Sequence, residues 1–88
     1  MFKENIYKQD LGYRVRSVGN KIILFGSEGA FELNETGLLI WDHINGSNRI
    51  DDILNVIVDT YNCSKEDATR DLNNFIEFLL QIKAIKES

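Results

Sequence analysis

The sequence contains no proline, one cysteine (Cys63) and one histidine (His43) among its 88 residues. A lone cysteine cannot form an intramolecular disulfide, and together with one histidine it offers no ligand spacing for zinc or iron. No apolar run approaches the ~18 residues of a membrane span, and no basic and apolar signal segment opens the chain. We therefore expect a cytoplasmic protein with no metal or other cofactor.

The chain is long enough for one hydrophobic core, which predicts a single domain spanning residues 1–88. Hydrophobic residues make up 43% of it and charged residues 27%, a balance typical of folded rather than disordered proteins. The net charge of −4 is concentrated in residues 34–82, which carry nine acidic and three basic side chains. This part of the chain should repel phosphate and favour a neutral or basic partner.

Three short segments near the N-terminus have the alternating or apolar, β-branched pattern of strands: residues 13–17, 22–25 and 30–33. In the third, Phe31 and Leu33 share one face, and Ala30 and Glu32 share the other. Glycines in the two connections favour tight turns, so we expect a three-stranded antiparallel meander. The segment before Gly12 is ambiguous, and its pattern fits either an extension of the first strand or a frayed end.

The first helix is predicted to begin at Asn34, whose side-chain oxygen can accept from an amide of the first turn. Glu35 lies where the helix dipole favours an anion. Gly46 suits the left-handed position that closes a helix.

Two further helical patterns follow. Apolar residues between Ile50 and Tyr61 lie on one face of a second helix. Ser64, with Asp67 three residues later, resembles a capping box that begins a third helix, and an apolar stripe runs along it as far as Ile82. The sequence therefore predicts an α+β fold, with a three-stranded antiparallel sheet followed by three helices.

Few side chains offer catalytic chemistry. His43 falls outside the apolar stripe of its helix, which favours a solvated surface position. Cys63 has no cationic neighbour in sequence and resembles a small buried hydrophobe. The anionic loop at residues 26–29 is too short to cradle a phosphate, and Asp51 with Asp52 suits the first turn of a helix. We therefore do not expect an enzyme.

The segment FELNETGLLIWDHINGS, residues 31–47, resembles the PqqD-like family, also called RiPP recognition elements. This family binds precursor peptides of ribosomally made, post-translationally modified natural products. The similarity extends roughly from Tyr13 to Ile85, and its strongest part is the spacing from Leu-Asn-Glu-Thr through Trp41 to Gly46. It continues in an Ile-Asp-Asp-Ile helix start and in the segment DLNNFIEFL of the third helix. The chain differs from the family pattern at Arg49, where threonine or serine is common, and in lacking a glycine after the last helix.

The resemblance implies a winged-helix-like domain and a mode of binding. A leader peptide would add as an antiparallel strand to the third predicted strand, in a cleft against the third helix. An edge strand has unpaired backbone groups that favour such an addition. The resemblance also implies delivery of the precursor to a separate modifying enzyme or leader peptidase, as in lasso-peptide pathways, or to a radical-SAM enzyme, as in pyrroloquinoline quinone synthesis. On this sequence the receiving strand is Ala30, Phe31, Glu32 and Leu33.

The other wall of the cleft is predicted from positions around the third helix. At 100° per residue, Phe78 falls roughly a quarter-turn from the core stripe and Phe75 at its edge. The opposite flank carries Asn73 and Leu80. The residues that we expect to line the cleft on this helix are Asp71, Asn74, Phe75 and Phe78.

Two other classes of protein compete with this interpretation. A winged-helix DNA-binding regulator needs a basic third helix, but residues 64–82 carry two basic and four acidic side chains. A carrier protein needs a modifiable serine, typically between aspartate and leucine, in an all-helical chain. Ser64 follows Cys63, and the strands also count against a carrier.

Overall fold

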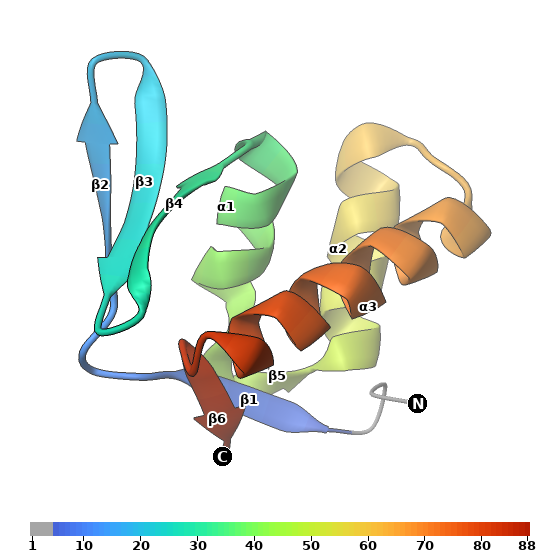
Figure 1. The fold of residues 1–88 in the computed structure, drawn as a ribbon. Helices are drawn as coiled ribbons and strands as arrows, with labels where there is room; N and C mark the ends of the chain where they lie inside the picture. The colour runs from blue at the N-terminus through green and yellow to red at the C-terminus, as the bar shows by residue number, and fades with distance from the viewer. Residues whose placement is uncertain (1–4) are drawn as a thin grey trace.

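The computed structural model describes residues 5–88 and has an α+β fold, as the sequence predicts (Figure 1). The elements in chain order are β1 (Ile6–Gln9), β2 (Arg14–Val18), β3 (Lys21–Gly26), β4 (Gly29–Leu33), α1 (Glu35–His43), β5 (Asn45–Arg49), α2 (Ile50–Tyr61), α3 (Lys65–Gln81) and β6 (Ile85–Glu87). The β2–β3 hairpin projects away from the three helices, and β1 and β6 lie at the base of the molecule.

The predicted meander is present as the sheet β2–β3–β4, with β3 in the centre. All its strands are antiparallel, and Leu24 of β3 lies opposite Val15 on one side and Phe31 on the other. Because paired residues point to the same face of a sheet, these three side chains share the face that contains the fully buried Leu24. This inner face is turned toward the helices.

A second sheet, with the order β5–β1–β6, was not predicted. The ambiguous N-terminal segment forms its central strand, which neither extends β2 nor frays. Its partners are β5, which reads Asn-Gly-Ser-Asn-Arg without any apolar alternation, and β6, which is only three residues long. Tyr7 and Ile85 from this sheet are buried, so it closes the base of the core.

The helix starts agree with the sequence, but the end of α1 does not. Asn34 Oδ1 accepts from the amide of Gly37 at 2.7 Å, and Ser64 Oγ accepts from the amide of Asp67 at 3.1 Å. The prediction that Gly46 closes the first helix is wrong, because α1 ends at His43 with Ile44 as its C-cap. Gly46 does have a positive φ of 83°, but it lies within β5, where strand pairing with β1 has replaced the helix.

The hydrophobic core lies where the helices meet the inner face of the β2–β3–β4 sheet. Its largest fully buried side chains come from one strand, the three helices and the C-cap of α1: Leu24, Ile40, Ile44, Ile53, Leu72, Ile76 and Leu79. Tyr13 joins the sheet to the end of α3, because its hydroxyl donates to the Ile82 carbonyl at 2.7 Å and accepts from the Glu28 amide at 3.1 Å. This buried hydroxyl fixes the β3–β4 hairpin relative to α3.

Removal of that hydroxyl tests its contribution. We expect Tyr13→Phe to lower the free energy of unfolding by about 1–3 kcal/mol, because the buried Ile82 carbonyl loses its donor. Tyr61, which is 41% exposed, provides the matched control, and Tyr61→Phe should change stability by less than about 0.5 kcal/mol. Urea denaturation followed by circular dichroism measures both values. Equal stability of the two variants would show that the Tyr13 hydroxyl does not hold the hairpin.

Candidate functional site

Strand β4 is an edge of its sheet and therefore has backbone groups that β3 does not pair. The β3–β4 pairing begins at Gly26 and Gly29, which flank a two-residue loop and form a hydrogen-bonded pair. Along the two strands, hydrogen-bonded pairs then alternate with pairs that are not hydrogen-bonded to each other. Phe31 and Leu33 thus face β3 with their backbone groups. The amides and carbonyls of Ala30 and Glu32 point to the open edge, where a further strand can pair with them.

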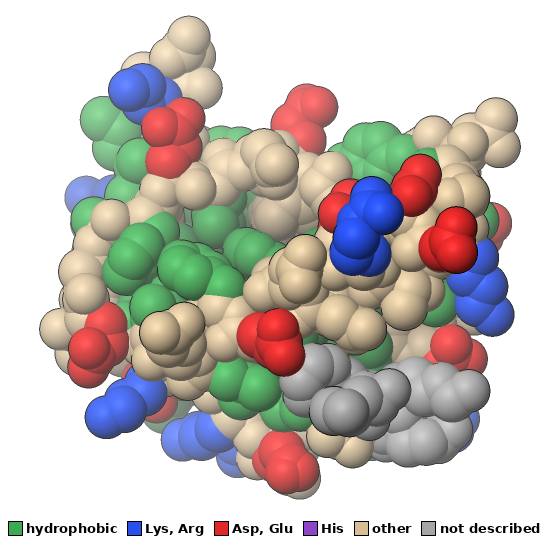
Figure 2. All heavy atoms as spheres, turned by 45° about the vertical axis from the view of Figure 1, so that its right-hand side comes forward, with side chains coloured by type: hydrophobic (Ala, Val, Ile, Leu, Met, Phe, Trp, Pro, Cys, Tyr) green, Lys and Arg blue, Asp and Glu red, His purple; other side chains and the backbone are tan. Residues whose placement is uncertain are grey.

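Aromatic side chains connect this edge to α3. The rings of Phe31 and Phe78 meet edge to face, with centroids 5.2 Å apart and an interplanar angle of 84°. Phe75 lies one turn earlier on α3, and its ring stacks on that of Phe78 with the two ring centroids 6.2 Å apart. All three are half-buried, so part of each ring is available to a ligand. Figure 2 shows exposed hydrophobic side chains below the projecting hairpin, apart from the charged side chains to their right.

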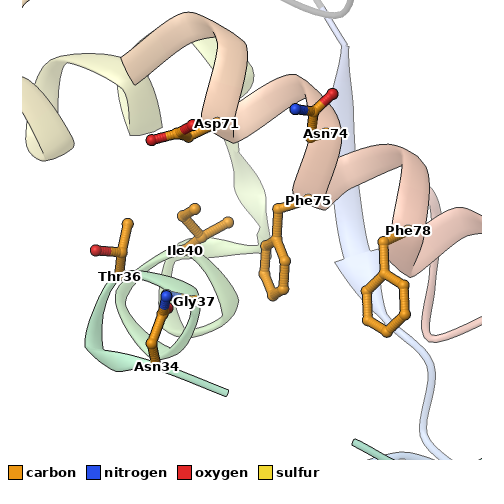
Figure 3. Close-up of a pocket in the computed structure, with 8 residues that line it drawn as sticks. All are labelled: Asn34, Thr36, Gly37, Ile40, Asp71, Asn74, Phe75 and Phe78. Atoms are coloured by element: carbon orange, nitrogen blue, oxygen red, sulfur yellow. The ribbon is translucent and has the colours of Figure 1, made fainter. Parts of the chain in front are cut away.

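An open groove of about 440 Å³ runs between the start of α1 and one flank of α3 (Figure 3). Phe75 and Phe78 project from α3 in the same direction, whereas Asn74 points away from them at the rim. Gly37 lies beside Phe75 of α3, where an added Cβ would make an ordinary contact at 3.5 Å, and beside its own helix cap, where the Cβ would lie a tighter 3.2 Å from Asn34 Oδ1. The lining residues are Asn34, Thr36, Gly37 and Ile40 from the α1 side, and Asp71, Asn74, Phe75 and Phe78 from α3.

The only charged side chain that lines this groove, among the described residues, is Asp71. It is exposed, and Arg70 Nε lies 3.8 Å from its carboxylate. Arg70 also contacts Asp67 at 3.2 Å, so one guanidinium is shared between two carboxylates. The groove therefore favours a ligand that is apolar along the aromatic rings and neutral or basic near Asp71.

The structure divides the predicted strand residues by face. Phe31 contacts Phe78, and Leu33 is buried in the core, where it anchors β4. The side chains of Ala30 and Glu32 are exposed on the opposite face of the sheet, so only their backbone groups reach the open edge near the groove. The four predicted residues of α3 all line the groove.

The wall of the groove that α1 contributes was not predicted from the sequence. Asn34 was identified as a helix cap, and it does hold the Gly37 amide, but it also lines the groove. Thr36 and Ile40 gave no signal of their own, because their position depends on how α1 packs against α3. The opposite flank of α3 is occupied differently: Asn73 lines a separate cavity of about 210 Å³ beside α2, and Leu80 packs against the core.

The remaining reactive residues lie in ordinary structural surroundings. His43 Nδ1 is 2.8 Å from the Leu39 carbonyl, and Cys63 is a half-buried free thiol that packs against the core. Within residues 5–88, no three His, Cys, Asp or Glu side chains come together as metal ligands would. None of the helices described is both long and apolar enough to cross a membrane.

Comparison with known proteins identifies the family. Residues 21–85 match the family described as Coenzyme PQQ synthesis protein D (PqqD). The match covers most of the chain, and the chain therefore belongs to the PqqD family. Among curated proteins, no significant match to the sequence was found.

Two solved structures share the fold. One is TbiB1 in complex with the TbiA(beta) leader peptide, with 21% identity, a TM-score of 0.76, and coverage of 90% of this chain and 94% of that one. The other is the solution structure of the PqqD truncation of Methylobacterium extorquens PqqCD, described as a functional, stand-alone RiPP recognition element. It has 20% identity and a TM-score of 0.76, and the match covers 92% of this chain and 88% of that one. At these identities, the likeness establishes a common fold.

Proposed function

We propose that the protein binds the leader segment of a ribosomal precursor peptide as an added strand on β4, in the groove against α3. The observation that carries this proposal is the open edge of β4 beside a groove lined by aromatic rings. Backbone pairing with Ala30 and Glu32 supplies affinity that depends little on sequence, and the groove selects the side chains. Membership of the PqqD family and the leader complex described for TbiB1 support the same function.

Alternate side chains of the added strand face opposite sides of the sheet. Those on the inner side contact Phe31 beside the groove and enter the groove itself, where Phe75 and Phe78 offer apolar contacts. A basic leader side chain near Asp71 competes with Arg70 for its carboxylate. Because that pair is exposed, its contribution is modest and falls with salt. The aromatic rings therefore contribute more to the selection of leader side chains than Asp71 does.

The protein acts in this proposal as a single non-catalytic domain. It holds the precursor for a separate modifying enzyme or leader peptidase. The groove contains amide, hydroxyl, carboxylate and aromatic groups but no arrangement of nucleophile and base among the described residues. DNA binding is disfavoured, because the exposed side of α3 pairs its only arginine with two aspartates.

Calorimetric titration with the cognate precursor tests the proposal. We expect the leader segment to bind with one-to-one stoichiometry at least about tenfold more tightly than the core segment. The intact mass of the precursor should stay unchanged after incubation with the protein alone. Equal affinity for the leader and core segments would contradict leader recognition, and a change in precursor mass would contradict a purely binding role.

A further inference from the structure

The outer face of the β2–β3–β4 sheet is uncovered. Leu24 and its neighbours on the inner face pack into the core, so the alternation of the strands turns Ile23 and Phe25 to the other side. In Figure 1 the helices lie on one side of this sheet, and no described element covers the other. Val18, at the tip of the hairpin, is 60% exposed. The sheet thus presents apolar side chains on both faces, although only one belongs to the core.

Basic residues accompany these apolar side chains. Arg14 lies opposite Phe25, Arg16 lies opposite Ile23, and Lys21 lies opposite Val18. The guanidinium of Arg16 sits 5.8 Å from the centre of the Phe25 ring. No ion pair to these three cations is found within residues 5–88. We define the outer face by the side chains that share this orientation: Arg14, Arg16, Val18, Lys21, Ile23, Phe25, Ala30 and Glu32. Glu32, opposite Ile23, is its one acidic side chain among the described residues, so the face carries three basic groups and one acidic group.

The charge of this face differs from that of the whole chain, which has a net charge of −4. Residues 34–82 carry most of the acidic side chains, and they form the helices on the other side of the sheet. A partner with an acidic surface is therefore attracted to the outer face and repelled by the helices, which fixes the orientation of docking.

A peptide bound as a strand at the edge of β4 would extend the outer face. Such a strand widens the β2–β3–β4 sheet by one strand. Every second side chain of the peptide then points to the outer face, beside Ala30 and Glu32. A protein docked on the outer face would thus contact both this chain and the bound peptide. A partner that must act on the peptide gains from such a joint surface.

We infer that the outer face docks the enzyme that processes the bound precursor, through a surface of that enzyme with an apolar centre and an acidic rim. This inference rests on the proposed function, since it assumes that a peptide is delivered. The half-buried Ile23 and Phe25 provide the apolar centre, and Arg14, Arg16 and Lys21 provide the rim. Nucleic acid fits this face less well, because the apolar side chains of Val18, Ile23 and Phe25 lie among the three cations and the chain as a whole is acidic.

The test measures two affinities for each variant. The probe is the purified enzyme that modifies the same precursor, followed by biolayer interferometry, and the leader segment is titrated in parallel by calorimetry. The double variant Arg16→Glu/Lys21→Glu should slow association with the enzyme about tenfold at low salt, and high salt should reduce the difference. Leader affinity should stay within twofold of the native value. Lys65→Glu, at the exposed start of α3, is the matched charge-reversal control and should change neither affinity by more than twofold.

A second variant probes the apolar centre without a change of charge. Ile23→Thr keeps a β-branched side chain that suits a strand, and it should speed dissociation of the enzyme several-fold. Native enzyme binding by both variants, with leader binding intact, would overturn the inference. The inference would also be overturned if the enzyme failed to bind the native protein. It would be overturned as well if a short DNA duplex bound the native protein and the charge-reversal variant no longer bound that duplex. A native protein that binds the enzyme but not the leader would instead overturn the proposed function.

Discussion

Replacement of Phe78 by alanine should weaken leader binding by about 1–3 kcal/mol, or about 5- to 150-fold in Kd. The Phe78 ring is held between Phe31 and Phe75, so it is fixed before the peptide arrives and loses little conformational freedom on binding. A strand added beside β4 would cover its exposed part. The truncation therefore removes apolar contact that only the complex buries. Calorimetric titration of the variant with the leader segment measures the loss.

Leu80→Ala is the matched control for this variant. Leu80 is also a half-buried residue of α3 that packs against the core, but it does not line the groove. Both truncations should reduce stability, Phe78→Ala partly through its aromatic contacts, which contribute about 0.5–1.5 kcal/mol per pair. Only Phe78→Ala should reduce leader affinity. If Leu80→Ala abolished binding while Phe78→Ala kept full affinity and a native circular dichroism spectrum, the groove would lie on the wrong flank of α3.

N-methylation or proline at a leader residue whose amide pairs with β4 should lower affinity about 5- to 150-fold. The change removes a hydrogen-bond donor and leaves a carbonyl of Ala30 or Glu32 without its partner, at a cost of about 1–3 kcal/mol. The same modification at the next leader residue is the control, because its amide points away from β4. Competition titrations with the set of modified peptides measure the pattern, which should alternate along the leader.

Hydrogen exchange locates the added strand independently. On binding, exchange should slow at the amides of Ala30 and Glu32, which face the open edge, and change less at Phe31, which already faces β3. The other edge of the sheet is β2, where Val15 and Ser17 have the equivalent outward orientation. Slowed exchange at Val15 and Ser17 with no change at Ala30 and Glu32 would move the peptide to β2.

The α3 wall of the groove was predictable because helix geometry is local. The angle between two residues on a helix depends only on their separation, so the pattern of Asp71, Phe75 and Phe78 relative to Leu72 could be read without a fold. The same holds for the faces of β4, where Phe31 and Leu33 had to share a side. The wall at Thr36 and Ile40 could not be predicted in this way, since nothing near them in sequence indicates that α1 packs beside α3.

The sequence by itself determined the α+β class, the β2–β3–β4 meander and the beginnings of α1 and α3, because alternation, turn glycines and capping side chains act over a few residues. Only the tertiary structure decided the second sheet, the early end of α1 and the groove. Strand β1 pairs with residues near positions 45–49 and 85–87, and backbone pairing of this kind leaves little trace in side-chain pattern. The groove likewise exists only where α1, α3 and the edge of β4 meet, which is a property of packing and not of any single segment.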